Sequence, residues 1–464
     1  MKTMIFQRDD TMPKRNIFRI STTHVILFSF LLVILMGSLL LVLPFSAKNG
    51  ESVSYIDALF TATTATCVTG LVTLPTASTW SFFGQAVILI LIQIGGLGTI
   101  TVLTRVMIAM HKRIGMEDRL LIQDAFNLNT MSGLVRFVKK VIFGTFLVEG
   151  IGALLYMTVF IPEFGLKGIW ISVFNAVSAF CNAGMDIIAE NSLCDYATNP
   201  IINTVTSTLI VLGGLGFIVW WDVIRVCKDF KKQKFNCFLR LTLHSKIVLL
   251  TTAVLIVLGA VLILLLEYNN PLTIGNASFF DKLQIAFFQS ITTRTAGFAT
   301  VAQENLTTGS SLVCLLLMLI GGSPVGTAGG IKTVTFAVLT ATAFTAVRNK
   351  KEVSLFGRNL TKETIYKSIA VFATFSFIVF SAALFLSTVT SASMLDILYE
   401  TISATATVGL SRNLTPFLNI PGKLVIIATM YFGRVGPISL AIAFNIKKQT
   451  VNIIKNPTEN ITVG

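Results

Sequence analysis

The chain has 464 residues, of which 53% are hydrophobic and only 12% are charged, and its formal net charge is +14. Soluble domains usually carry about a quarter charged residues, and a chain this apolar would expose more hydrophobic surface than water tolerates. The composition therefore excludes a soluble protein and predicts an integral membrane protein. The basic residues form short clusters, such as KDFKKQK at 228–234 and RNKK at 348–351, which is typical of cytoplasmic loops rather than of nucleic-acid binding.

The first predicted element is an apolar run from about Ser21 to Leu43. It is longer than the core of a signal peptide, which has roughly 7–15 residues, and no A-x-A cleavage pattern follows it. We therefore expect a retained membrane-spanning helix, preceded by a basic cytoplasmic segment at 1–20.

From this helix onward one pattern occurs four times, and we predict repeats at 21–115, 134–235, 240–350 and 362–448. Each copy has a long apolar helix, an outer loop, a short semi-polar helix, a glycine and a second long helix. The glycines are separated by 114, 113 and 112 residues; an aromatic residue lies ten positions before each, and another glycine follows 24 to 29 positions later. In chain order these markers are Gly70, Gly184, Gly297 and Gly409, then Phe60, Phe174, Phe287 and Tyr399, then Gly95, Gly213, Gly321 and Gly433.

The short helices, predicted at 54–66, 168–180, 281–293 and 394–406, are too short and too polar to cross about 30 Å of hydrocarbon. Such a segment must be buried in protein or line water, so we expect each one to enter the membrane and return. A basic loop closes every repeat, so all four enter from the outer side and form one pore. The predicted fold is an all-α membrane protein with eight spanning helices and four re-entrant pore helices around a central pseudo-fourfold pore, followed by a tail at 449–464.

The glycine of each short loop favours an ion-selectivity filter. Backbone carbonyl oxygens can replace the hydration shell of potassium when the chain adopts unusual backbone angles, which glycine tolerates. The alternative is that these glycines only let helices pack closely, as small residues often do in membranes. Their place in a polar re-entrant segment that occurs four times favours the filter.

The second helix of repeat 3 begins at 311–320 and is interrupted by GGSPVGTAGGIKT at 321–333, which we call the gate loop. Ten helical residues rise about 15 Å, so this helix ends near the middle of the bilayer, where flexible backbone is suited to obstruct a pore. The alternatives are a hinge without a gating role and a phosphate-binding loop. The latter is disfavoured because Ile331 separates Gly330 from Lys332, whereas a P-loop has lysine directly after glycine. Lys332 either repels cations in the closed state or lies at the cytoplasmic end of the break. The residues of interest are Gly321, Gly322, Ser323, Pro324, Gly326, Thr327, Gly329, Gly330 and Lys332.

Two arginines are expected at membrane depth. Arg434 falls within the second helix of repeat 4, where an arginine costs at least about 2.5–3.5 kcal/mol to insert and therefore indicates a function. The alternative for Arg434 is a structural partner for the backbone carbonyls of the broken helix. Arg294 lies three residues before Gly297, and we expect it to brace the filter from behind, because an arginine in the ion path would block cations.

Four helix–pore loop–helix repeats in one chain, with one glycine per loop, resemble the Trk/Ktr/HKT superfamily of potassium transporters, most of all the bacterial Ktr membrane subunit. The resemblance implies potassium uptake with potassium held in the filter, and Gly70 matches the potassium-preferring members. It also implies that the gate loop opens and closes the pore and that Arg434 is an electrostatic barrier or an anchor for the gate loop. The filter residues that it implies are Val68, Thr69, Gly70, Asn182, Ala183, Gly184, Thr295, Ala296, Gly297, Thr407, Val408 and Gly409.

The resemblance further implies partners and a location. Ktr membrane subunits form homodimers in the bacterial plasma membrane with both termini in the cytoplasm, and a cytosolic ring of RCK-type nucleotide-binding regulatory subunits docks on them. This chain has no G-x-G-x-x-G after a strand, so any nucleotide control must come from that partner. No covalently bound cofactor is expected, and sodium stays open as an activator.

Two other classes of protein are less well supported. An ion-coupled secondary cation symporter would typically show inverted repeats and intramembrane acids, whereas these repeats share one orientation. An enzyme would need a convergent nucleophile, base or metal set, and the three histidines and six cysteines show no metal-ligand spacing. We therefore expect neither enzymatic activity nor nucleic-acid binding.

Overall fold

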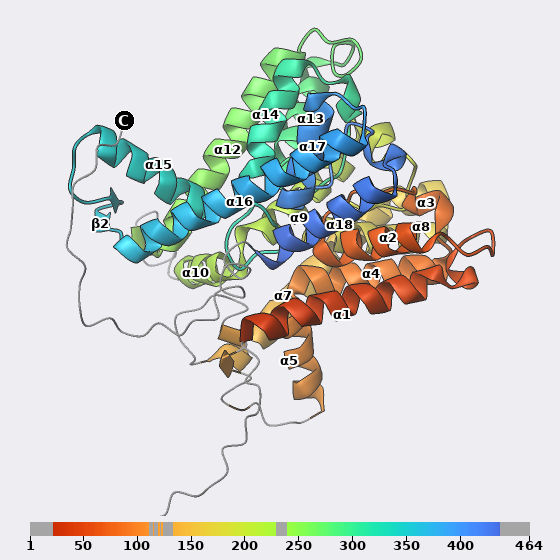
Figure 1. The fold of residues 1–464 in the computed structure, drawn as a ribbon, viewed down its shortest axis with the longest axis horizontal. Helices are drawn as coiled ribbons and strands as arrows, with labels where there is room; N and C mark the ends of the chain where they lie inside the picture. The colour runs from red at the N-terminus through yellow and green to blue at the C-terminus, as the bar shows by residue number, and fades with distance from the viewer. Residues whose placement is uncertain are drawn as a thin grey trace, which may run out of the picture.

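The computed structural model describes residues 22–110, 115, 119–120, 122–123, 133–228 and 239–436. The predicted segments 1–20 and 449–464, together with the end of repeat 4, lie outside the described residues. The described chain consists of helices, connecting loops and one two-stranded hairpin, and the helices follow the four predicted repeats in order (Figure 1).

Each repeat contains a long first helix, a short pore helix and a second helix. The first helices are α1 (Thr22–Val42), α7 (Leu134–Phe164), α12 (Leu243–Glu267) and α16 (Lys362–Val389). The pore helices are α2 (Tyr55–Cys67), α8 (Lys167–Cys181), α13 (Phe279–Thr292) and α17 (Met394–Ala406). The second helices are α4 (Phe82–Leu97) with α5 (Thr99–Ala109), α9 (Pro200–Leu215) with α10 (Phe217–Lys228), α14 (Thr308–Leu319) with α15 (Thr333–Val347), and α18 (Ile420–Val435). Short helices lie in the loops before or after the pore helices, at η1 (Pro44–Ser46), α3 (Thr76–Thr79), η2 (Cys194–Tyr196), η4 (Gln303–Asn305) and η5 (Thr415–Phe417).

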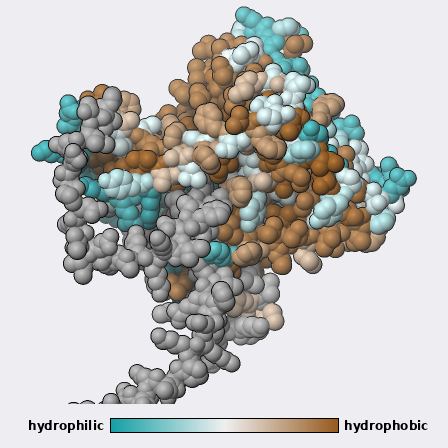
Figure 2. Space-filling model, viewed as in Figure 1, coloured by the Kyte–Doolittle hydropathy of each residue, from teal (hydrophilic) through white to brown (hydrophobic). Residues whose placement is uncertain are grey.

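The four first helices are long and apolar enough to cross a membrane. Large apolar side chains stay exposed on them, including Phe28, Phe143, Val254 and Phe377. Figure 2 shows this apolar surface as a brown area over much of the visible face, with hydrophilic residues at its edges. Because exposed apolar surface of this extent is costly in water, it indicates contact with lipid.

The repeats close into a ring through one recurring contact. The second helix of each repeat packs against the pore helix of the next: α4 on α8, α9 on α13, α14 on α17, and α18 on α2. The last of these pairs joins the end of the described chain to its beginning. In Figure 1, repeat 1 in red and orange and repeat 3 in green lie on opposite sides, with repeat 4 in blue between them. The four repeats therefore surround a common axis.

Three of the pore helices begin with the same local signal. A serine side chain accepts a hydrogen bond from the backbone N–H of an aspartate three residues later, in the pairs Ser54–Asp57, Ser278–Asp281 and Ser393–Asp396. The serine satisfies one unpaired N–H group, and the aspartate adds a favourable charge near the positive end of the helix dipole. This signal fixes where these three short helices start.

The second helices are not the continuous spans that the sequence predicts. α4 is followed by Gly98, α9 is followed by Gly216 with a bend of 99° before α10, and α18 is followed by Gly436, the last described residue. These glycines share φ values of 84°, 86° and 94°, which side chains rarely adopt. Each lies three residues after a marker glycine of the second helix, so a G-x-x-G motif marks the end of α4, α9 and α18.

The interruption in repeat 3 is longer. α14 ends at Leu319 and α15 begins at Thr333, one residue from the predicted limit at each end. After α15, the strands β1 (Ser354–Leu355) and β2 (Arg358–Asn359) pair antiparallel, with Ser354 opposite Asn359, and lead into α16.

Candidate functional site

The four marker glycines of the pore loops, one from each repeat, lie together around one centre. All have positive φ, 98° at Gly70, 64° at Gly184, 82° at Gly297 and 96° at Gly409. A Cβ atom on any of them would lie 2.2–2.6 Å from the carbonyl oxygen that precedes the glycine of the next repeat. In turn these oxygens belong to Ala183, Ala296, Val408 and Thr69. Both the backbone angle and the space require glycine, and the contacts close a cycle through all four repeats.

The residue two positions before each glycine is left-handed as well. Its φ is 56° at Val68, 60° at Asn182, 70° at Thr295 and 52° at Thr407. A left-handed residue other than glycine costs about 1–2 kcal/mol, so the surrounding contacts must hold it. The predicted filter segments therefore have the unusual backbone that their proposed role needs.

A hydroxyl group near the end of each pore helix holds the loop in this shape, a feature that the glycine spacing does not reveal. The N–H groups of Gly70 and Gly409 donate to the hydroxyls of Thr64 and Ser403 at 2.9 and 3.1 Å. In repeat 2 the N–H of Met185 donates to the hydroxyl of Ser178 at 3.1 Å. The signal is a serine or threonine six residues before the glycine.

Between its loop hydroxyl and its glycine, repeat 3 has one residue fewer than the other repeats. Its corresponding hydroxyl is that of Thr292, five residues before Gly297, and it donates to the carbonyl oxygen of Phe298 at 2.6 Å. The predicted aromatic marker Phe287 is 37% exposed, whereas Phe288 is 1% exposed and packs in the core. The aromatic marker is therefore wrong by one position in this repeat, because the spacing between glycines does not reveal a shift inside the pore helix.

The four glycines line one cavity of about 440 Å³, which we call the vestibule. The carboxylates of Asp186, Glu190 and Glu304 belong to the same lining. Burial raises the pKa of Asp186 to about 6, although its hydrogen bonds with Ser192 and with the backbone of Ile188 and Ala189 oppose that shift. The acids give the vestibule a negative lining that is favourable to cations. Among the described residues, no group of three or more His, Cys, Asp or Glu side chains could hold a metal ion.

The glycine markers of the second helices have a packing role in three repeats. A Cβ atom on Gly95, Gly213 or Gly433 would lie 2.0 Å from a carbonyl oxygen near the end of a pore helix, that of Thr66, Phe180 or Thr405. These glycines let each second helix touch the backbone directly behind a filter segment. The fourth marker, Gly321, differs, because its Cβ would meet the carbonyl oxygen of Gly329 within the gate loop itself.

The gate loop is bonded to the broken helix of repeat 2. The N–H groups of Ser323 and Thr327 donate to the carbonyl oxygens of Gly214 and Gly213, at 2.8 and 3.1 Å. In return the N–H of Phe217 donates to the carbonyl oxygen of Val325 at 3.1 Å. The last carbonyls of a helix have no partner inside the helix, so the break after α9 and the gate loop satisfy each other.

The gate loop also closes on itself and on a pore helix. Gly321 and Ile331 are joined by a hydrogen bond of 3.0 Å from the N–H of Gly321, and the N–H of Thr333 donates to the carbonyl oxygen of Gly322 at 3.0 Å. The hydroxyl of Thr327 donates to the carbonyl oxygen of Phe180, in α8, at 3.0 Å. The loop therefore lies against the end of the repeat 2 pore helix, directly next to the filter segments.

The three predicted cations all contact backbone carbonyls at or near the gate loop. Arg434 donates to the carbonyl oxygen of Thr327 in the loop and to that of Gly95 in α4, both at 2.5 Å. Lys332 donates to the carbonyl oxygen of Ala328 at 2.6 Å. Arg294 is buried and donates to the carbonyl oxygen of Gly321 at 3.1 Å. Its contact is thus with the start of the gate loop, a partner that the sequence analysis did not name.

Comparison with known proteins places the chain in a family. A family model described as the TrkH cation transport protein matches residues 5–455. The chain belongs to the TrkH family of cation transport proteins. The membership predicted from the repeats in the sequence is thereby confirmed, and so is the all-α membrane fold.

The relatives within this family match the chain almost end to end. A protein of Enterococcus hirae named potassium/sodium uptake protein NtpJ is 39% identical over 98% of this chain and 99% of its own length. The Ktr system potassium uptake protein B of Bacillus subtilis is 38% identical over 96% of this chain and 97% of its own length. The crystal structure of the potassium transporter TrkH from Vibrio parahaemolyticus has a TM-score of 0.72, with 17% identity, and covers 94% of this chain and 86% of that one. That similarity concerns the fold.

Proposed function

We propose that this chain is the ion-translocating membrane subunit of a potassium uptake system in the bacterial plasma membrane. The observation that carries the proposal is the closed cycle of Gly70, Gly184, Gly297 and Gly409 at the base of an acid-lined vestibule. Backbone carbonyls in such a ring are suited to replace the hydration shell of potassium. The names of the relatives from Enterococcus hirae and Bacillus subtilis support potassium as the substrate.

The ion path passes through the centre of the ring. The twelve residues of the filter segments, three in each repeat, form the selective part, and the acids of the vestibule attract cations to it. The gate loop beneath the filter opens and closes the path. Arg434 is the anchor that holds this loop, because its guanidinium bonds to Thr327 in the loop and to Gly95 in repeat 1. Lys332 adds a positive charge that opposes cation passage in the closed state.

Regulation and assembly follow the Ktr pattern in this proposal. The chain works as a homodimer with both termini in the cytoplasm, and a cytosolic ring of nucleotide-binding subunits opens the gate. The words "Ktr system" in the names of several relatives support a multi-component assembly. Sodium acts as an activator in this proposal, and the name of the Enterococcus hirae relative, a potassium/sodium uptake protein, supports some role for sodium.

The test is ion binding to the purified chain, because binding to a filter requires neither an open gate nor a partner. Potassium and sodium are titrated separately by isothermal calorimetry into detergent-solubilised protein in a buffer free of both ions. We expect tighter binding of potassium than of sodium. Equal binding of the two ions, or binding of neither, would contradict the selective filter.

A further inference from the structure

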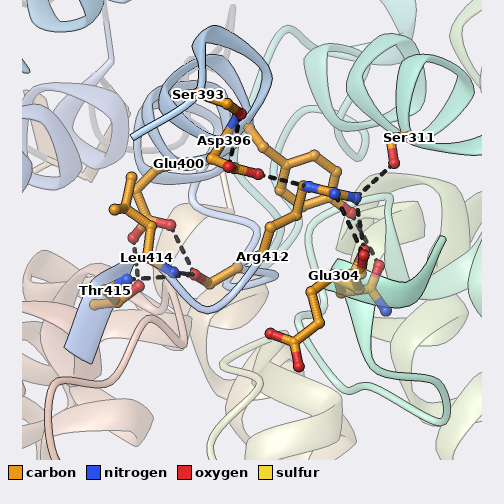
Figure 3. A network of polar contacts seen from close by, with 11 residues as sticks. Glu304, Ser311, Ser393, Asp396, Glu400, Arg412, Leu414 and Thr415 are labelled. Atoms are coloured by element: carbon orange, nitrogen blue, oxygen red, sulfur yellow. Dashed lines mark hydrogen bonds and ion pairs between the residues drawn. The ribbon is translucent and has the colours of Figure 1, made fainter. Parts of the chain in front are cut away.

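Arg412, three residues after Gly409, joins two repeats on the outer side of the ring (Figure 3). Its side chain is only 14% exposed. The Nε atom donates to Asp396 Oδ1 at 2.8 Å, in the pore helix of its own repeat. The two terminal nitrogens donate to repeat 3: to the carbonyl oxygen of Gln303 and the hydroxyl of Ser311, both at 2.8 Å, and to the carbonyl oxygen of Glu304 at 3.3 Å. One guanidinium group therefore fastens repeat 4 to repeat 3.

The acceptor side of this contact is itself fixed. The side chains of Gln303 and Gln289 exchange two hydrogen bonds, of 2.6 and 3.3 Å, which tie the outer loop of repeat 3 to its pore helix. The hydroxyl of Tyr399, in the pore helix of repeat 4, donates to Gln303 Oε1 at 2.9 Å. All three side chains are buried. Arg412 thus binds a rigid partner rather than a free loop.

The loop segment that carries Arg412 is also held by a second group, in α17. The fully buried carboxylate of Glu400, in α17, accepts hydrogen bonds from the hydroxyls of Ser411 and Thr415. Ser411 lies between Gly409 and Arg412 in the chain, so the segment that follows the repeat 4 filter is fixed on both sides. At the matching positions, three residues after the glycine, the other repeats have Thr73, Ile187 and Thr300, none of which is charged.

Arg412 does not present its charge to the ion path. Its guanidinium is paired with Asp396, and the carboxylate of Glu304 points away from it in Figure 3. The contact crosses the same junction at which a Cβ on Gly297 would meet the carbonyl oxygen of Val408, at 2.4 Å. The bonds of Arg412 to repeats 3 and 4, which we call the clamp, therefore lie beside the one place where these repeats meet in the ring of glycines.

We propose that Arg412 is a positioning residue for ion selectivity, which sets the place of the Val408–Gly409 carbonyls relative to Gly297 by locking repeat 4 to repeat 3. This inference rests on the proposed filter. Without the clamp, the carbonyls of repeat 4 can move outward and accommodate ions of different size, so the preference for potassium falls while both ions still bind.

The test compares Arg412→Gln and Arg412→Lys with a matched control, Lys423→Gln. Lys423 pairs with Asp57 at the start of the repeat 1 pore helix, at 2.6 Å and with a similarly low exposure of 16%, but it does not contact the segment after a filter glycine. Calorimetry gives the ratio of the sodium and potassium dissociation constants for each purified protein, and thermal unfolding gives its stability. We expect both Arg412 variants to lower the ratio by about tenfold, the change that about 1.4 kcal/mol of differential binding produces. The control is expected to lose stability without a change in the ratio.

Arg412→Lys separates geometry from charge, because lysine keeps the charge but its single nitrogen cannot bridge Asp396 and the carbonyls of repeat 3. A wild-type ratio in Arg412→Lys would overturn the proposal, and so would an equal loss of ratio in the control. If Arg412→Gln does not fold, Asp396→Asn weakens the same clamp with little change in volume, and an unchanged ratio there would also overturn it. A wild-type protein that prefers neither ion would instead contradict the filter itself.

Discussion

Glycine at the four filter positions is required by two independent features of each residue. The φ values lie between 64° and 98°, and the carbonyl oxygen of the next repeat occupies the space that a side chain would need. The equal spacing in the sequence was enough to predict these four positions, since each repeat is built to one pattern. The hydroxyls that hold the loops were not predictable from that spacing. The residue missing in repeat 3 was not predictable either, because it shifts the register of the pore helix without moving the glycine.

Gly70→Ser is expected to weaken the preference for potassium over sodium by about tenfold or more. The new Cβ would lie 2.5 Å from the carbonyl oxygen of Ala183, so the ring must open on one side. Competition of sodium with potassium uptake in proteoliposomes measures the change. Gly150→Ser is the control, because nothing lies within 4 Å of a Cβ at that position. Unchanged selectivity in Gly70→Ser would show that the first loop is not part of the filter.

Asp186 is expected to make cation entry depend on pH. Its pKa, raised to about 6 by burial, leaves it ionised at pH 7.5 and protonated below pH 6. Lowering the external pH therefore removes a negative charge from the vestibule, and the initial rate of potassium uptake falls between pH 7 and 5. Asp186→Asn is expected to give a low rate that varies little over this range, whereas Glu51→Gln, at an exposed outer loop, keeps the wild-type profile. A wild-type profile in Asp186→Asn would assign the titration to another group.

Breaks in the second helices are the main difference between the predicted and observed elements. The sequence indicated one break, in repeat 3, because five glycines and a proline lie together there. The glycines Gly98, Gly216 and Gly436 are a weaker signal, since glycines are common in membrane helices. The need for a break at Gly216 becomes clear only in the structure, where Gly213 and Gly214 turn their carbonyls to the gate loop. Those partners come from more than 100 residues away.

Arg434→Gln is expected to release the gate loop. Hydrogen bonds to charged groups contribute about 1.5–3 kcal/mol each, and Arg434 makes one to the loop and one to α4. Potassium flux into proteoliposomes without any regulatory subunit is expected to rise by about tenfold or more. Arg348→Gln, at the exposed end of α15, serves as the control for the loss of a positive charge. Unchanged or lower flux in Arg434→Gln would contradict the role of an anchor.

The whole molecule is a ring whose closure depends on contacts between the first and last repeats. Fourfold repetition and short polar helices made this architecture predictable, since a ring of four repeats buries the four re-entrant segments in protein. The ion pairs between neighbouring repeats were not predictable, because the two junctions of repeat 4 use different residues. An ion pair between Lys423 and Asp57 joins repeats 4 and 1, whereas the Arg412 clamp joins repeats 4 and 3.

The proposed orientation in the membrane can be checked with one native thiol. Cys227 is exposed at the end of α10, close to the basic segment that we expect in the cytoplasm. A membrane-impermeant maleimide is expected to label Cys227 in inside-out vesicles and not in right-side-out vesicles, as judged by mass spectrometry of the peptides. A cysteine introduced at Glu51, in an outer loop, is expected to show the opposite pattern. Labelling of Cys227 from the outside would reverse the proposed topology.

The attachment of the gate loop has a consequence for how current would vary with time. The gate loop is held at once by repeat 2, by the guanidinium of Arg434 and by bonds between its own ends. A small displacement therefore leaves several buried N–H and carbonyl groups without partners. Half-open positions are therefore costly, and we expect the loop to move between two places instead of sliding. The current through a single molecule would then switch at random between two levels. Any regulator would act on the dwell times and leave the height of the steps unchanged.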